Sequence, residues 1–397
     1  MSAPKLEQTS VAAISYRDQS NQLLIRVFAR GQDQQLHICT FDEHSLLWKW
    51  TQIPAPPNNI GIHKVLGTAT FNAGPQYVLA FVHALPENTI HVWVSQEGIQ
   101  SGWQAVTKAQ KHVSCSEMGV VTYDDNGSPQ AYGLCTDSDL FRVHGSWKNN
   151  ALVFDETNEG KPGGNSFPLS GGRPGAISFV SADQVPQHQI VVYAVGSVPG
   201  SGDQLCRDFR AVSADESIDA SKKLSSTWIW SVLGAPTNNQ AKPISITNVA
   251  ADFYSSFGSP GQARVYAVAT GGDLWLFTNP SNWKSLGHPK STQALGTPSV
   301  ISYPGAVAGS SVENVFVAGL DGSLYEHSDN APWVSLGKPA GGWHVSNPSA
   351  IAIPAAPIGL HAVIPPVQVY CVSSDTFLYA SLKQPKGQFL WSTPLGA

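Results

Sequence analysis

Several polar side chains lie within or directly after short apolar runs of the kind found in buried strands. Asp252 lies inside the run 249–253, where burial would raise the pKa of its carboxyl group and let it act as an acid near neutral pH. Tyrosine hydroxyls and one guanidinium at the ends of comparable runs can donate hydrogen bonds to ligand oxygens. The residues predicted to be catalytic are Asp252, Tyr16, Arg17, Tyr123, Tyr254 and Tyr303. The alternative for Asp252 is a structural residue whose hydrogen bonds tie neighbouring strands together.

A second set of side chains is suited to binding a ligand. The predicted substrate-binding residues are Arg26, Arg264, His63, Trp48, Trp93, Trp275 and Trp343. The arginines can donate to ligand oxygens, and the four tryptophans lie outside the position at which a tryptophan recurs or double it, so they are candidate pocket walls. His63 and Glu117 precede apolar runs and are weaker acid or base candidates, with ordinary loop residues as the alternative.

Composition and motifs exclude several classes of function. The sequence has no HExxH, zinc-spaced Cys/His set, Walker loop or GxSxG motif, so we expect no cofactor and no metal. Lys and Arg number 23 against 28 Asp and Glu, which leaves no basic face for nucleic acid. No apolar stretch reaches the roughly 18 residues of a membrane span, and residues 1–10 lack a signal-peptide core. A cytoplasmic protein is therefore predicted, with its five scattered cysteines as thiols.

The strands that would position these residues recur along the chain. Charged residues make up only 13% of the sequence, and 36 Gly and 28 Pro favour turns over long helices. An apolar run rich in small residues occurs seven times, at 11–16, 65–71, 118–124, 175–183, 247–254, 297–303 and 347–353. Runs that are apolar almost throughout are typical of strands buried on both faces.

Each apolar run is followed by two further strand-like segments and, in most copies, by a strand with a tryptophan. These tryptophans are Trp48, Trp103, Trp228, Trp283, Trp333 and Trp391, and only the third copy, after Trp147, is unclear. Four strands repeated seven times predict an all-β fold, a seven-bladed β-propeller in which residues 1–397 form a single domain. Two unrelated β-sandwiches are the alternative, but they do not predict one strand order repeated seven times.

The propeller hypothesis also predicts where the polar residues meet. The ends of the innermost strands are expected to open onto the axial cavity, where propellers commonly bind small molecules. A remodelled pocket between blades is the alternative position. Longer connections are predicted at 160–172 and 214–226.

The first repeat resembles that of the fungal fucose-specific lectins. The segments that carry the resemblance are VAAISY at 11–16 and IRVFARGQDQQLHICTFDEHSLLWKW at 25–50. These lectins are usually six-bladed propellers, so the resemblance makes six blades the alternative to seven. It also implies pockets between blades, each built from an Arg of the second strand, a Glu of the third and an aromatic ring.

Transferring these positions to each repeat shows how far this chain departs from the lectins. The Arg position is occupied by Arg26, Leu79, Gln130, Val191, Arg264, Asn314 and Gln368. The Glu position is occupied by Ile38, Val92, Arg142, Arg207, Leu276, Glu326 and Ala380. No repeat keeps both residues, so the comparison implies that fucose sites of this kind are lost in every copy.

A similar lectin-derived propeller occurs in the hetero-Diels-Alderases of fungal tropolone sesquiterpenoid biosynthesis. That resemblance implies a cofactor-independent pericyclase, which would assist dehydration of a hydroxymethyl tropolone to a quinone methide and its stereoselective addition to a humulene-type alkene. Its partners would be hydrophobic small molecules, the tropolone and a macrocyclic terpene. Two alternatives remain: a carbohydrate-binding protein of altered specificity, whose partners would be glycans, and a scaffold for protein interactions.

Overall fold

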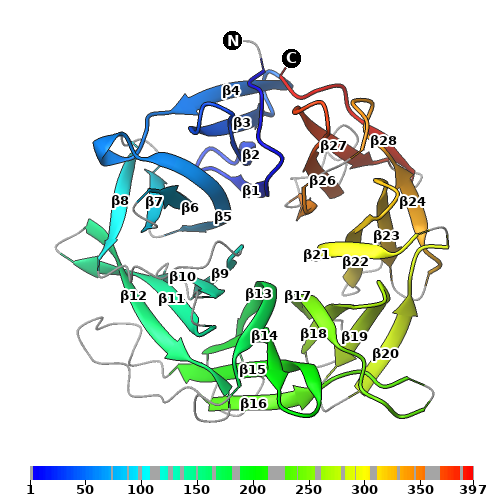
Figure 1. The fold of residues 1–397 in the computed structure, drawn as a ribbon. Helices are drawn as coiled ribbons and strands as arrows, with labels where there is room; N and C mark the ends of the chain where they lie inside the picture. Colours follow the sequence, from blue (N-terminus) through cyan, green and yellow to red (C-terminus); the bar gives the residue numbers. More distant parts are fainter. Residues whose placement is uncertain are drawn as a thin grey trace.

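In a computed structural model, the protein forms a ring of small β-sheets around a central axis (Figure 1). The residues described are 3–72, 75–86, 89–96, 101–107, 117–123, 128–134, 138–148, 151–162, 167–180, 188–212, 229–238, 240–254, 261–278, 282–290, 292–304, 311–328, 331–343, 346–353, 367–384 and 388–396. Within them, the only helix of three or more residues is the short 3-10 turn η1 (Pro57–Asn59). The prediction of an all-β propeller is confirmed.

The strands follow one order, from the axis outward, in every part of the ring (Figure 1). The inner strands are β1 (Ala12–Arg17), β5 (Gly61–Asn72), β9 (Gly119–Tyr123), β13 (Leu169–Val180), β17 (Ile246–Tyr254), β21 (Ala294–Pro304) and β25 (Ser349–Ala352). The second strands are β2 (Leu23–Arg30), β6 (Gln76–Leu85), β10 (Ser128–Leu134), β14 (His188–Val198), β18 (Gln262–Ala269), β22 (Ser311–Gly319) and β26 (Val367–Val372). The third strands are β3 (Leu36–Asp42), β7 (Thr89–Gln96), β11 (Leu140–Lys148), β15 (Gly202–Val212), β19 (Leu274–Thr278), β23 (Leu324–Ser328) and β27 (Leu378–Lys383). The outer strands are β4 (Leu47–Ile53), β8 (Gly102–Thr107), β12 (Ala151–Gly160), β16 (Ile229–Gly234), β20 (Asn282–Gly287), β24 (Val334–Gly337) and β28 (Phe389–Trp391).

Each set of four consecutive strands forms an antiparallel sheet, and we call these sets blades 1 to 7 in chain order. The described part of the chain thus contains seven such blades. The outer strands β8 and β12 also pair in parallel, at Val106 with Phe154, which joins blades 2 and 3 into one eight-stranded sheet. In the other blades, the hydrogen-bonded sheet stops at β4, β16, β20, β24 and β28.

Tryptophans in or beside the outer strands connect neighbouring blades. Their indole Nε1 atoms donate to backbone carbonyls at the end of the preceding blade. These bonds run from Trp103 to Pro54 (2.6 Å), Trp230 to Glu159 (3.3 Å), Trp333 to Leu286 (2.9 Å) and Trp391 to Leu336 (2.6 Å). The repeated tryptophan therefore acts as a latch between these blades. In blade 4 the latch is made by Trp230, whereas the predicted Trp228 lies outside the described residues.

The same latch closes the ring between the two ends of the chain, which lie side by side in Figure 1. Trp50 of blade 1 donates from Nε1 to the carbonyl of Leu395, 2.7 Å away. Near the other terminus, the amide of Leu6 donates to the carbonyl of Thr376 in blade 7 at 2.8 Å. Blades 1 and 7 are therefore joined by hydrogen bonds from both ends of the chain.

The hydrophobic core is divided among the gaps between blades. Phe81 of blade 2 meets Phe154 of blade 3 edge to face, with ring centroids 6.1 Å apart. Ile25 of blade 1 belongs to one cluster with Tyr370 of blade 7. Strands such as β6 and β26 are thus buried on both faces because neighbouring blades cover both sides of them, whereas outer strands such as β4 and β20 are partly exposed.

Two local predictions require correction. The third repeat does have an outer strand, β12, but its sequence ALVFDETNEG carries no tryptophan, and Trp147 ends the preceding strand instead. The predicted connection 160–172 includes the first residues of β13, because this inner strand begins at Leu169. The predicted connection 214–226 lies outside the described residues.

Among the helices that the structure describes, none is long and apolar enough to cross a membrane.

Candidate functional site

A pocket of about 200 Å³ opens between blades 1 and 2. It is lined by Tyr16, Asp18, Leu24, Arg26, Gln76, Val78, Ser95 and Gln96. We call it the Arg26 pocket. Its lining combines a guanidinium, a carboxylate, two amides and a hydroxyl with the ring of Tyr16, which is the mixture of hydrogen-bonding and apolar surface that small polar ligands require.

The alternation of β2 places Arg26 in this pocket. Ile25 and Val27 on either side of it are fully buried in the core, so the Arg26 side chain projects from the opposite face of the strand. Arg26 donates from Nη1 to Ser95 Oγ at 3.3 Å, and its guanidinium carbon lies 5.6 Å from the centre of the Tyr16 ring. Among the described residues, no carboxylate lies within ion-pair distance of Arg26, so most of its five N–H donors remain available to a ligand.

The arginine at the corresponding position of blade 5 is placed differently. Arg264 Nη1 lies 2.6 Å from Glu313 Oε2, and its guanidinium stacks 3.7 Å from the centre of the Tyr254 ring. Tyr266 also donates its hydroxyl hydrogen to Glu313 Oε2, at 2.5 Å. In blade 2, Val78 occupies the position that Glu313 holds in blade 6, and β6 brings no carboxylate to Arg26. The sequence did not identify Glu313 as a partner of Arg264.

Asp252 connects blades 5 and 6. Ser302 of β21 donates to its Oδ2 at 2.6 Å, and the backbone amide of Phe253 donates to its Oδ1 at 2.8 Å. Burial raises the pKa of Asp252, while these hydrogen bonds and Arg264 act in the opposite direction. This geometry agrees with the structural alternative stated for Asp252.

The other residues predicted to be catalytic lie apart from one another. Arg17 donates to the carbonyl of Asn21 at 2.8 Å and pairs with Glu43 at 3.4 Å. Tyr303 accepts from Lys383 at 3.4 Å, in the gap between blades 6 and 7. Tyr123 ends β9, and its side chain lies outside the described part of the structure.

The remaining candidates for binding also occupy separate places. The His63 ring meets His83 at 5.4 Å, and burial lowers the pKa of His63. Trp93 is buried against Phe28, with ring centroids 5.8 Å apart.

Three more tryptophans were predicted as pocket walls. Trp48 packs on Phe41 and Tyr370, and Trp275 is half-buried in β19. Trp343 is 61% exposed and lies beneath Lys338. None of these three, nor Trp93, lines a described pocket.

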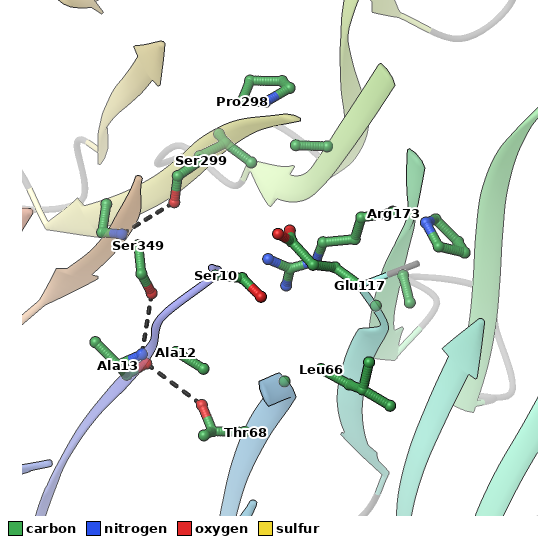
Figure 2. A pocket seen from close by; sticks show the side chains of 18 of the residues that line it. Ser10, Ala12, Ala13, Leu66, Thr68, Glu117, Arg173, Pro298, Ser299 and Ser349 are labelled. Atoms are coloured by element: carbon green, nitrogen blue, oxygen red, sulfur yellow. Dashed lines mark hydrogen bonds between the residues drawn. The ribbon is translucent and has the colours of Figure 1, made fainter. Parts of the chain in front are cut away.

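A second cavity, of about 150 Å³, lies on the axis (Figure 2). It is lined by the first residues of β1, β9 and β25 and by the middle of β5, β13, β17 and β21, not by the carboxyl ends of these strands. The predicted meeting of strand-end residues at the axis therefore does not occur in the described structure. Tyr16 lines the Arg26 pocket instead. The charged residues of the axial cavity are Glu117, which the sequence indicated, and Arg173, which it did not.

An aromatic pocket of about 210 Å³ lies between blades 2 and 3. Tyr77, Trp103 and Trp147 line it, and the rings of Tyr77 and Trp147 meet edge to face at 5.4 Å. Gln96 borders both this pocket and the Arg26 pocket. One end of blade 2 is therefore flanked by a polar pocket and an aromatic pocket.

Metal ligands and disulfides do not assemble in the described ranges. No three His, Cys, Asp or Glu side chains of these ranges come together as a metal site. Cys39, Cys206 and Cys371 are buried free thiols, and burial raises the pKa of each. The other two cysteines lie outside the described residues.

Comparison with known proteins shows that this ring of four-stranded blades has the β-propeller fold, which is also that of solved lectins. The BP39L lectin from Burkholderia pseudomallei is similar, with a TM-score of 0.62 and 15% identity over 100% of this chain and 99% of that one. The six-bladed fungal lectin from Aleuria aurantia gives a TM-score of 0.53 and 13% identity over 99% and 97% of the two chains. At these identities the likeness shows the fold alone. No family model and no curated protein matches the chain.

Proposed function

We propose that this protein is a carbohydrate-binding protein whose specificity differs from that of the fucose lectins, and that it binds a saccharide in the Arg26 pocket. One observation carries the proposal: a half-buried arginine faces a pocket of about 200 Å³ without a carboxylate partner among the described residues. A half-buried guanidinium with donors directed at a pocket favours a ligand that supplies acceptor oxygens. Sugar hydroxyls supply them at close spacing.

The pocket also offers what the rest of a sugar ring needs. Asp18 and the amides of Gln76 and Gln96 can accept hydrogen bonds from hydroxyl groups, and the Tyr16 ring can pack on an apolar sugar face. The position of the lectin glutamate is held by Ile38, which pairs with Phe28 in the core. Asp18 would therefore replace that glutamate as the carboxylate acceptor, from the turn that follows β1, and this difference supports an altered specificity.

The solved structures of similar fold are lectins, including complexes with α-methyl-L-fucoside and Fucα1-6GlcNAc. We prefer the carbohydrate-binding function to the pericyclase on this ground and on the polar lining of the Arg26 pocket. A hetero-Diels-Alder reaction would instead favour an enclosed apolar pocket that excludes water. The pericyclase remains the second candidate because of the resemblance to the lectin-derived hetero-Diels-Alderases.

A thermal-shift titration separates the two functions. One series contains a panel of monosaccharides with L-fucose and a fucosylated oligosaccharide, and the other contains a hydroxymethyl tropolone with a humulene-type alkene. We expect stabilisation by at least one saccharide and none by the tropolone, because ligand binding to the folded state raises its melting temperature. Stabilisation by the tropolone alone would refute the carbohydrate function and support the enzyme.

A further inference from the structure

The axial cavity is lined by two opposite charges. Figure 2 shows the guanidinium of Arg173 and the carboxylate of Glu117 next to each other, both pointing into the cavity. They are the only charged side chains among its described lining residues. Neither a hydrogen bond nor an ion pair joins them in the described structure, although they lie close enough to interact electrostatically.

Glu117 is fixed by a contact that crosses the ring. Asn347, which precedes the inner strand of blade 7, donates from Nδ2 to Glu117 Oε1 at 2.8 Å, and Glu117 precedes the inner strand of blade 3. The amide of Thr297 donates to Asn347 Oδ1 at 3.1 Å and holds that side chain in turn. One carboxylate oxygen of Glu117 is thus occupied, and its other oxygen can accept from a ligand.

Arg173 is less well compensated. Burial lowers the pKa of the Arg173 guanidinium, and Glu117 offsets only part of this effect. The charged form of a buried guanidinium is stabilised by a further anionic group at hydrogen-bonding distance.

The cavity leaves room in front of these two charges. Its walls consist mainly of small residues, such as Ala12, Gly67, Gly119 and Gly175. The volume of about 150 Å³ is well above the roughly 10–15 Å³ that one water molecule needs. A molecule of several heavy atoms can therefore lie in the cavity against both Glu117 and Arg173, whereas a long apolar side chain finds no matching surface there.

We propose that the axial cavity binds a small zwitterion of the amino-acid type, with the ligand carboxylate at Arg173 and its ammonium group at Glu117. Such a ligand matches both charges and adds no net charge to a site that is already neutral. A simple anion would meet Glu117, and a simple cation would meet Arg173. This site shares no lining residue with the Arg26 pocket, so the proposal is independent of the carbohydrate function.

Calorimetric titration of the full chain with L-alanine tests the proposal directly. Propionate and isopropylamine serve as single-charge controls of similar size. We expect L-alanine to bind with a Kd of about 1 mM, in keeping with its few heavy atoms, and both controls to bind at least about tenfold more weakly. Equal binding of propionate would mean a simple anion site and would overturn the zwitterion assignment, as would no alanine binding at concentrations of about 50 mM.

Two variants locate the bound ligand. Glu117→Gln and Arg173→Gln should each weaken L-alanine binding at least about tenfold, while Arg26→Gln, in the other pocket, should leave it unchanged. If a variant does not fold, competition by L-alanine analogues on the wild-type protein replaces it: N-acetylalanine and alaninamide each lack one charge and should fail to compete. Unchanged binding in both variants, or competition by both analogues, would overturn the proposal.

Discussion

At the scale of single residues, two arginines in equivalent positions have opposite surroundings. Arg264 forms an ion pair with Glu313, whose side chain is 1% exposed. Among the described residues, the guanidinium of Arg26 instead donates to a serine hydroxyl and lies over a tyrosine ring. A buried carboxylate that loses its partner is strongly destabilising, while a half-buried arginine beside an open pocket contributes little to folding. The two positions therefore separate a structural arginine from a binding arginine.

We predict that Arg264→Gln lowers the free energy of unfolding by about 3 kcal/mol because it leaves Glu313 buried without a cation. Arg26→Gln is the matched variant and should change stability by less than about 1 kcal/mol. Urea denaturation of both proteins measures the difference. Equal losses of unfolding free energy in the two variants would show that the ion pair of Arg264 with Glu313 does not stabilise the fold.

A buried acid in blade 4 gives the protein a pH dependence. Burial raises the pKa of Asp208 to about 8 and Glu159 adds to the rise, while the Phe209 amide and Arg142 oppose it. The folded pKa thus lies above the ordinary value of 3.8, so between about pH 4 and pH 8 the folded protein binds more protons than the unfolded chain. Stability must fall as the pH rises through this window and become level above it.

We predict that Asp208→Asn removes this contribution, which amounts to at most about 1.4 kcal/mol per pH unit. Denaturant midpoints at pH 5 and pH 8 should then differ less in the variant than in the wild type. Asp252 and Glu313 also have raised pKa values and keep part of the slope in both proteins. An identical slope in wild type and variant would contradict the assignment to Asp208.

At the scale of elements, the tryptophan latch is the contact that repeats. Trp333 donates to the carbonyl of Leu286 in the preceding blade. Trp283, at the same place in blade 5, is an exception, because its Nε1 is buried without a partner among the described residues. Both residues are tryptophans at the same position of their blades, and they differ in whether the indole Nε1 donates a hydrogen bond to the preceding blade.

We predict that Trp333→Phe costs about 1 kcal/mol more than Trp283→Phe, since only Trp333 loses an inter-blade hydrogen bond. Both substitutions remove similar apolar area, so the comparison isolates the indole donor. Chemical denaturation of the two variants provides the measurement. A larger cost at Trp283 would mean that packing, not the latch, determines the role of the recurrent tryptophan.

The strands were largely predictable from the sequence, whereas the candidate sites were only partly so. Each inner strand coincides with one of the seven apolar runs because strands covered on both faces need apolar residues throughout. The outer strand of blade 3 was unclear from the sequence because it carries no tryptophan. The Arg26 pocket joins Arg26 to Ser95, 69 residues apart, and such a meeting depends on how neighbouring blades pack. Arg26 and Tyr16 were named in advance, but their partners on blade 2 were not.

At the scale of the whole molecule, ring closure depends on contacts between the chain ends. Leu395 is 5% exposed in the cluster between blades 1 and 7, and its carbonyl accepts the Trp50 latch. The C-terminal segment therefore stabilises blade 1 although it adds no strand to it.

We predict that Leu395→Ala lowers the free energy of unfolding by about 2–5 kcal/mol, as expected for a buried leucine. Leu390→Ala is the matched control, because Leu390 is 56% exposed and should cost less than about 0.5 kcal/mol. Guanidinium denaturation measures both. Similar small effects in the two variants would show that the C-terminal segment does not contribute to closure.

The central claim is that this propeller binds a saccharide through Arg26. Isothermal titration of the wild type, Arg26→Gln and Arg264→Gln with the saccharide that stabilises best in the thermal-shift panel tests it most directly. We predict that Arg26→Gln weakens binding at least about tenfold, through loss of a charged hydrogen-bond donor, and that folded Arg264→Gln binds as the wild type does. Equal affinity of the wild type and Arg26→Gln would contradict the claim.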